Sequence, residues 1–440
     1  MNSLLIQTEV ILQKMTIEWF VSHKLRERYC RVILPGKPDI YVFPKQTSNI
    51  YAICAVKYGS LDQSYSLPDG NTVVLPEGVA HFLEHKMFVQ PNGQDAFDIF
   101  ASLGADANAY TSYDRTAYLF NCTSNFDQSF ATLLNMVTHP YFTTESVERE
   151  QGIIKQEINM YNDDPDTVCY ENMMSILYEK HPVRLNVCGT SKSIASITDK
   201  LLYDCHRIFY NPSNMVIVVC GPVNVEQVID IVNQEQGWGG AIDFSRHICR
   251  ETEPPVQNNI VQNMRVSMPL FAMGFKELEF ESNPQKRHTK DMVASILERM
   301  LFSTSSELYN ELYDRRLITS PFSVGRAAEA DYAFTEICGT ANNVEVVAEK
   351  IVSHIRKKRT TGLSLDDFER CKRRRIGDAI SRFDSTEDIA NGIVGYAFDG
   401  LDILKDPEIV ESIRFEDVVQ LFENMYCEKN MAVSYVLPIK

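Results

Sequence analysis

The sequence predicts an α+β protein made of two similar halves, and three observations lead to this prediction. Its 440 residues are more than one ordinary domain contains. Strand-like and helix-like segments follow one another in a similar order on either side of a polar stretch. The segment NMVIVVCGP at 214–222 also has a counterpart, NMAVSYVLP at 430–438. A spacing of about 200 residues favours a repeated domain over a solenoid, whose repeats are far shorter.

The elements expected along the chain come from hydrophobic periodicity and from turn residues. In the first half we expect strands at 31–44, 50–60, 116–121 and 215–221 and an amphipathic helix at 224–236. In the second half we expect strands at 266–277, 331–340 and 430–438 and helices at 291–302 and 343–358. The polar, aperiodic residues between them give a first domain over 1–240, a linker over 241–262 and a second domain over 263–440.

Residues 81–85 read HFLEH and are the first candidate for a functional site. In a helix, His81, Glu84 and His85 project from the same side, and their apolar neighbours indicate a largely buried helix. Two neutral imidazoles one turn apart suit zinc, and a carboxylate between them suits a general base. This inverted H-x-x-E-H order is a metallopeptidase motif. A harmless pair of histidines is the alternative, because chance gives this pattern in roughly one such chain in a hundred.

A catalytic zinc needs a third protein ligand, and a predicted helix at 145–166 offers two acidic candidates. Glu150 and Glu157 are seven residues apart, about two helical turns, so both face the same way. One can complete the zinc sphere while the other orients a ligand. Two glutamates on a solvated helix face are the alternative reading of the same spacing.

Several segments together resemble a known family. HFLEH is followed by Glu157 in the setting E-x6-E-I-N-M-Y, and residues 104–120 read GADANAYTSYDRTAYLF. HPVRLNVCGT at 181–190 and FYNPSNMVIVVCG at 209–221 also match. The chain resembles the pitrilysin and insulinase family of zinc peptidases over its whole length. It resembles the small bacterial processing proteases of this family and also the beta subunit of the mitochondrial processing peptidase.

The resemblance implies a fold and a set of roles. Each domain would be a mostly antiparallel sheet with helices packed on one face. One Zn²⁺ per chain would be the cofactor, Glu84 the general base and Glu150 an acid that orients a ligand. The implied zinc ligands are His81, His85 and Glu157. The implied substrate-binding strand carries Asn108, Ala109 and Tyr110, and its free edge would pair with the backbone of an extended peptide.

The second half departs from the family pattern. Members that act alone carry an Arg and a Tyr there, which hold the substrate near the metal. In residues 305–324 Tyr313 stands in place of that Arg and Phe322 in place of that Tyr, although Arg315 or Arg316 substitutes if the alignment shifts. We therefore expect a heterodimer with a similar-sized family member that carries the Arg/Tyr clamp, with a homodimer as the alternative.

Composition excludes several classes of protein. A net charge of −16 argues against a nucleic-acid partner, and the basic runs at 356–359 and 372–375 read as solvated helix faces. No run of 18 apolar residues is present, so we expect no membrane span, and residues 1–15 lack the layout of a signal peptide. Eleven scattered cysteines without C-x-x-C indicate reduced thiols and a cytoplasmic location.

The function predicted from these observations is a zinc-dependent endopeptidase that hydrolyses extended peptides or leader segments. A non-catalytic scaffold, or an accessory subunit of a modification or processing complex, is the alternative. The motif at 81–85 favours the enzyme, because a scaffold has no need of an acid between two buried histidines.

Overall fold

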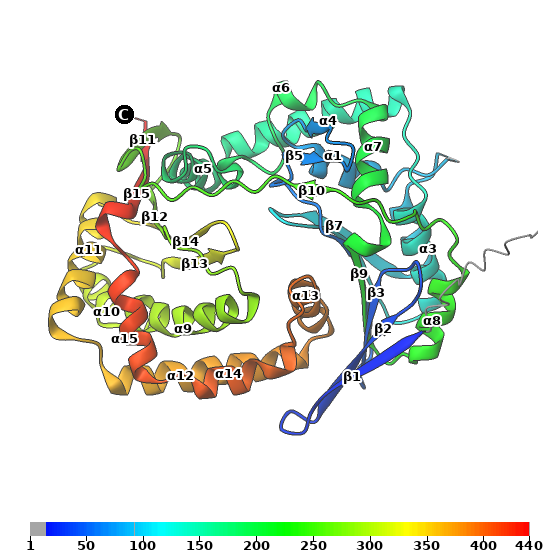
Figure 1. Ribbon diagram of the computed structural model, residues 1–440. Helices are drawn as coiled ribbons and strands as arrows, with labels where there is room; N and C mark the ends of the chain where they lie inside the picture. Colours follow the sequence, from blue (N-terminus) through cyan, green and yellow to red (C-terminus); the bar gives the residue numbers. More distant parts are fainter. Residues whose placement is uncertain (1–14, 92, 440) are drawn as a thin grey trace, which may run out of the picture.

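The computed structural model describes residues 15–91 and 93–439, so part of the segment on which the signal-peptide prediction rests lies outside it. Figure 1 shows two lobes, the first half of the chain at the right and the second at the left. The green segment around β10 crosses between them above, and α12 and α14 cross below.

The first half is built on a seven-stranded sheet in the order β1-β2-β3-β9-β4-β8-β7. Only β3 and β9 run parallel, and the other neighbours are antiparallel. Its strands are β1 Thr16–Ser22, β2 Glu27–Ile33, β3 Asp39–Pro44, β4 Ile50–Val56, β7 Ala105–Thr111, β8 Thr116–Cys122 and β9 Met215–Gly221. The segment 31–44, expected as one strand, is the end of β2 and all of β3, because Gly36 takes a positive φ in the turn between them.

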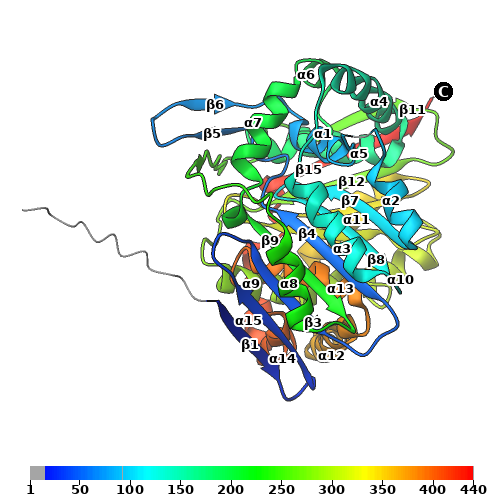
Figure 2. The ribbon, with the colours of Figure 1, turned by 90° about the vertical axis from the view of Figure 1, so that its right-hand side faces the viewer.

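Helices of the first half cover one face of this sheet and enclose its larger core. They are α1 Val79–Lys86, α2 Ala96–Leu103, α3 Phe126–Thr138, α4 Thr144–Asp163, α6 Ser191–Ile194, α7 Asp199–Phe209 and α8 Val225–Gln234. A small separate sheet joins β5 Ser64–Ser66, β6 Thr72–Val74 and β10 Ser245–Arg246. Figure 2 shows β5 and β6 projecting from the body of the molecule.

The second half repeats this plan. Its sheet has the order β11-β15-β12-β14-β13, in which β15 is parallel to β11 and antiparallel to β12. In the first sheet β9 has the same position, parallel to β3 and antiparallel to β4. The similar segments 214–222 and 430–438 contain β9 and β15, so the internal similarity marks equivalent central strands. This arrangement confirms the α+β prediction.

The remaining elements have the following bounds. The strands are β11 Asn259–Met264, β12 Leu270–Lys276, β13 Ser323–Ala328, β14 Ala333–Thr340 and β15 Met431–Pro438. The helices are α9 Pro284–Phe302, α10 Glu307–Asp314, α11 Val344–Thr361, α12 Leu365–Ser381, α13 Thr386–Ala397, α14 Asp406–Ser412 and α15 Phe415–Asn424. Short 3-10 helices lie at Pro182–Arg184, Pro212–Asn214, Arg382–Asp384, Ile403–Lys405 and Glu428–Asn430. The predicted linker 241–262 contains β10 and the start of β11.

Each sheet is covered on its second face by a helix from the other half. α13 packs on the first sheet, where Ile389 and Ile393 contact the apolar side chains of β4 and β9. α5 Pro165–Leu177 packs on β12 and β15 of the second sheet. Strands β4, β9 and β12 are consequently buried on both faces along their whole length. Because each half contributes a helix to the core of the other half's sheet, the two halves are packed against each other.

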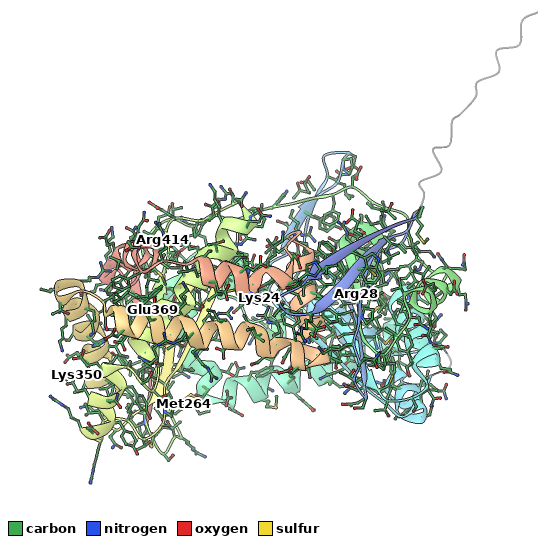
Figure 3. The ribbon with its side chains drawn as sticks, turned by 90° about the horizontal axis from the view of Figure 1, so that it is seen from below. Lys24, Arg28, Met264, Lys350, Glu369 and Arg414 are labelled. Carbon is green, nitrogen blue, oxygen red and sulfur yellow. The ribbon has the colours of Figure 1, made fainter. Side chains whose placement is uncertain are left out.

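The basic runs lie on helices whose charges are paired. Arg356 contacts Glu428, Lys358 contacts Glu307 at 2.8 Å and Arg374 contacts Asp378 at 3.0 Å. Figure 3 shows these helices from below, with Lys350 of α11 and Glu369 of α12 labelled. Within the described part of the chain, no helix is long and apolar enough to cross a membrane.

Candidate metal centre

The helix that carries HFLEH begins at a tight junction. Gly78 precedes α1 with a φ of 85°, and a Cβ at this position would lie 2.3 Å from the carbonyl oxygen of Cys188. Only glycine combines this left-handed backbone with so close an approach. The buried side chains of Phe82 and Leu83 then anchor α1 in the core. This anchoring turns His81, Glu84 and His85 together towards α4.

Helix α4 presents its acids to α1. Thr143 caps the helix through a reciprocal pair of hydrogen bonds with Ser146, and Ile154 and Ile158 are buried in the core. Glu150 and Glu157 lie on the same side of α4, as their spacing predicted, and both face the motif helix.

Three donor groups converge between the two helices. Glu157 Oε1 lies 3.6 Å from His81 Nε2, and Glu157 Oε2 lies 3.6 Å from His85 Nε2. All three groups offer a ligand atom within 4.8 Å of the others. Tetrahedral zinc with bonds of about 2.0–2.1 Å sets its ligand atoms roughly 3.3 Å apart, which is close to the observed separations. The structure therefore brings together the three residues expected to hold zinc.

The protonation state of His81 fits a metal ligand. Burial, and then the neighbouring His85, lowers the pKa of His81 to about 3, so its imidazole is neutral at physiological pH. A neutral imidazole is the form that binds metals. His81 Nδ1 is buried without a hydrogen-bond partner, whereas Nε2 faces Glu157 Oε1 at 3.6 Å and Cys188 Sγ at 3.8 Å. Burial lowers the pKa of His85, but the hydrogen bond to Glu150 and the charges of the surrounding glutamates outweigh it and raise this pKa, so a metal at this position would displace the proton of His85. Two imidazoles and a carboxylate are a donor set that zinc takes in catalytic sites.

Glu150 lies behind the donor groups. Its Oε1 is 3.2 Å from His85 Nδ1, and its Oε2 is 3.8 Å from the Nζ of the buried Lys86. Burial alone would raise the pKa of Glu150, but His85 and then Lys86 outweigh it and hold the pKa below its usual range. The carboxylate is thus ionised and contacts His85 Nδ1, which is the contact that the predicted orienting role of Glu150 requires.

Glu84 stands beside the donor groups and is buried. Thr111 Oγ1 donates a hydrogen bond of 2.5 Å to Glu84 Oε2. Burial raises the pKa of Glu84, while the bond from Thr111 and the charge of His85 act in the opposite direction. A raised carboxyl pKa suits a group that accepts and returns a proton near neutral pH.

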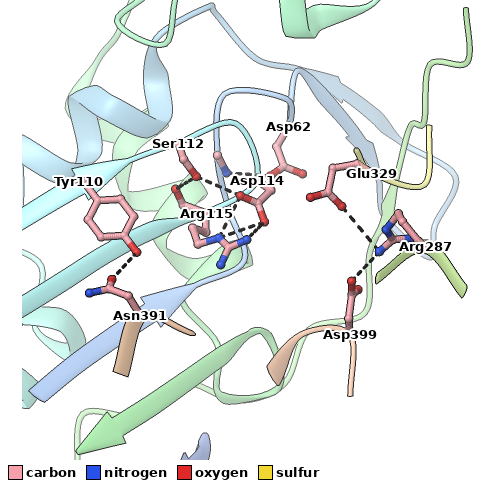
Figure 4. Close-up of polar contacts among 10 residues, drawn as sticks. Asp62, Tyr110, Ser112, Asp114, Arg115, Arg287, Glu329, Asn391 and Asp399 are labelled. Atoms are coloured by element: carbon pink, nitrogen blue, oxygen red, sulfur yellow. Dashed lines mark hydrogen bonds and ion pairs between the residues drawn. The ribbon is translucent and has the colours of Figure 1, made fainter. Parts of the chain in front are cut away.

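The expected substrate strand is β7, the outermost strand of the first sheet. Ala109, Tyr110 and Thr111 all border the same cleft as the metal ligands, and the hydroxyl of Tyr110 donates to Asn391 Oδ1 at 3.2 Å. Figure 4 shows this contact from β7 to the second half. Asn108 Oδ1 accepts the N–H of Ala109 at 2.9 Å, so this side chain occupies a backbone donor that an added strand would use.

A cleft of about 430 Å³ opens over the site. Its lining residues all belong to residues 81–188, so in the described chain the second half contributes none of them. Tyr113, Tyr170 and Met174 form an apolar part of the wall, and Glu171 and Arg184 add charges. The hydroxyls of Tyr113 and Tyr170 are 3.0 Å apart.

Several residues of the site show no functional signal in the sequence. Thr111 lies in the segment 104–120 that resembles the family. A threonine in a strand does not by itself indicate a hydrogen bond to a distant glutamate such as Glu84. Cys188, whose Sγ lies 3.8 Å from His81 Nε2, was also missed. Lys86 follows the motif directly, yet nothing in the sequence separates a buried lysine from an exposed one.

Comparison with known proteins identifies the family. The profile of the insulinase family, peptidase family M16, matches residues 75–191, and that of the M16 inactive domain matches 196–375. The chain is 36% identical over 411 residues to the uncharacterised zinc protease YmfH of Bacillus subtilis, covering 91% of this chain and 94% of YmfH. The chain belongs to peptidase family M16. Within M16, the zinc protease PqqE of Helicobacter pylori is 25% identical over 76% of this chain and 77% of its own length.

Solved M16 structures share the fold. An M16-like peptidase from Alicyclobacillus acidocaldarius superposes with a TM-score of 0.91 at 31% identity, covering 95% of this chain and all of that one. A protease from Helicobacter pylori has a TM-score of 0.79 at 19% identity over 94% of this chain and 100% of its own, which shows the fold alone. With relatives named zinc proteases and a fitting donor set, zinc is the cofactor of this M16 chain.

Proposed function

We propose that this chain is a zinc-dependent endopeptidase that hydrolyses extended peptides or leader segments, as the catalytic subunit of a heterodimer. The observation that carries the proposal is the convergence of His81, His85 and Glu157 with a buried carboxylate, Glu84, beside them. A scaffold protein has no need for this combination, because each buried polar group costs free energy of folding.

The protein groups divide the chemistry as follows. When bound, zinc supplies a Lewis acid that activates a water and polarises the scissile carbonyl. Thr111 holds Oε2 of Glu84, so Oε1 is the oxygen left to accept the proton of the attacking water. Glu84 then returns this proton to the nitrogen of the leaving amine. Glu150 keeps the His85 ring in position during these transfers.

The position of β7 supports an extended substrate. A peptide in β conformation would add to this outer strand and replace Asn108 Oδ1 as the partner of the Ala109 N–H. Backbone pairing of this kind does not depend on substrate sequence. It demands an unfolded segment, which is a property of leader peptides.

The second half supports the need for a partner chain. Phe322, at the position of the family tyrosine, is only 7% exposed, and Tyr313 is 54% exposed on α10. Arg315 contacts Glu311 at 3.3 Å, and neither Arg315 nor Arg316 lines the cleft in the part of the chain described. A similar-sized M16 chain with the Arg/Tyr pair would supply the groups that hold the substrate carbonyl.

We also propose a cytoplasmic location, with reduced thiols. All eleven cysteines are free, and eight of them are buried. A buried structural thiol is compatible with a reducing compartment and gains nothing from an oxidising one.

The proposal is tested by cleavage of a quenched peptide library. The chain is purified alone and with a co-expressed M16 chain that carries the Arg/Tyr pair, in wild-type and Glu84→Gln forms. We expect cleavage by the wild-type pair, little by the wild-type chain alone and none by the Glu84→Gln pair. Full activity of the isolated chain would exclude the heterodimer, and an active Glu84→Gln pair would exclude Glu84 as the base.

A further inference from the structure

A fully buried lysine lies directly after the metal-binding motif. Lys86 is the last residue of α1, and its side chain has no exposed surface. Burying an ammonium group costs several kcal/mol unless other groups compensate for the lost water. The proposed chemistry uses His81, Glu84 and His85 and gives Lys86 no role. Its position therefore requires an explanation.

The groups around Lys86 are few. Its Nζ lies 3.8 Å from Glu150 Oε2 and donates to the carbonyl oxygen of Ser146 at 3.4 Å. Asp95 adds a more distant negative charge and Arg149 an opposing positive one. Glu150 is thus the closest counter-charge, and it is itself only 6% exposed.

Glu150 is shared between two neighbouring residues of α1. Its Oε1 contacts His85 Nδ1 at 3.2 Å, while Oε2 is on the side of Lys86. With one partner for each oxygen, the carboxylate has one preferred orientation. In that orientation the carboxylate accepts a hydrogen bond from His85 Nδ1, and Nε2 faces Glu157 and the zinc position.

We propose that Lys86 is a positioning residue of the zinc site, which fixes Glu150 in the orientation that pairs one of its oxygens with His85. The inference rests on the proposed function only in taking His81, His85 and Glu157 as the zinc ligands. Without Lys86, Oε2 of Glu150 would be buried without its cation, and the carboxylate would no longer be held in this orientation. His85 would then lose the hydrogen bond that orients its ring.

The test measures zinc affinity, by competition with a chromophoric chelator, together with thermal unfolding of the metal-free chain. Lys86→Met keeps the length and apolar stem of the side chain and removes its charge. We expect zinc affinity to fall about 10- to 100-fold, the usual effect of losing an outer partner of a metal ligand. The melting temperature of the metal-free chain should also fall, since Glu150 is left buried without its nearest counter-charge.

A double-mutant cycle with Glu150→Gln distinguishes an effect of Lys86 through Glu150 from an effect that does not involve Glu150. If Lys86 acts through Glu150, Lys86→Met causes no further loss of zinc affinity in the Glu150→Gln chain. The double variant should also be more stable than Glu150→Gln alone, which leaves Lys86 buried without a counter-charge. Lys155→Met, which removes an exposed lysine from α4, is the matched control and should bind zinc as the wild type does.

Two results would overturn the inference. One is a Lys86→Met chain with wild-type zinc affinity and a lowered melting temperature, which marks Lys86 as structural only. The other is an equal loss of affinity in the presence and absence of Glu150. If Lys86→Met does not fold, Lys86→Arg tests the same point, because retained charge should retain most of the affinity. A chain that binds zinc yet cleaves no peptide would contradict the peptidase and leave this inference standing.

Discussion

Thr111 and Glu84 come from different elements, yet the hydroxyl of Thr111 donates a hydrogen bond of 2.5 Å to Glu84 Oε2. Thr111 ends the outer strand β7, and Glu84 lies on α1. The bond connects the strand on which we place the substrate to the group that we propose as the general base. A substrate paired with β7 would therefore lie next to the carboxylate that accepts the proton.

Replacing Thr111 by Val keeps the shape of the side chain and removes this bond. We expect kcat to fall about 10- to 100-fold, because a hydrogen bond to a charged group contributes about 1.5–3 kcal/mol. Zinc content should not change, since Thr111 contacts no proposed ligand. Steady-state kinetics of the active pair and metal analysis check both statements, and a Thr111→Val pair with wild-type kcat would refute the role.

Glu251 makes the stability of the fold depend on pH. Its carboxylate accepts the N–H groups of Glu179, Lys180 and His181 and contacts Lys276 Nζ at 2.5 Å. Burial opposes ionisation, but Lys276 and these N–H groups outweigh it and lower the pKa of Glu251 from 4.5 to about 2. Because the folded pKa is depressed, the stabilisation is present above about pH 4.5 and is lost as pH falls towards 2.

Thermal unfolding of wild type and Glu251→Gln at several pH values measures this contribution. We expect the variant to be less stable near pH 7 and the difference to shrink below pH 4.5. If the difference in stability between wild type and variant stays constant down to pH 3, the charge of Glu251 does not cause it.

The packing of α13 on the first sheet predicts a second effect on stability. Ile389 is fully buried between the two halves. Ile389→Ala should lower the free energy of unfolding by about 2–4 kcal/mol, because it leaves a cavity. Ile380→Ala, at a side chain that is 43% exposed on α12, is the control and should change it little. Urea denaturation measures both, and equal values for the two variants would contradict the observed packing.

Local features of this protein were the easiest to predict from its sequence. The spacing of His81, Glu84 and His85 lies within one helical turn, so helix geometry alone places them on one side. The two similar halves were visible because β9 and β15 occupy equivalent central positions and are apolar for the same reason.

Features that depend on distant contacts were not predictable from pattern. The apolar faces of α5 and α13 indicate burial, but no periodicity says that each packs on the sheet of the other half. The spacing of Glu150 and Glu157 does not show which of them is the zinc ligand, so only the family resemblance assigns this role to Glu157. Lys86 and Thr111 look ordinary in sequence, and only the folded chain brings them to Glu150 and Glu84.

The most direct test of the account is zinc binding by the wild type, Glu84→Gln and Glu157→Gln, measured by equilibrium dialysis and metal analysis. We predict about one zinc per chain for the wild type and for Glu84→Gln, and a loss of zinc for Glu157→Gln. The division of roles requires this contrast, since Glu157 is placed as a ligand and Glu84 as the base. A Glu84→Gln chain that loses zinc, or a Glu157→Gln chain that keeps it with wild-type affinity, would contradict the account.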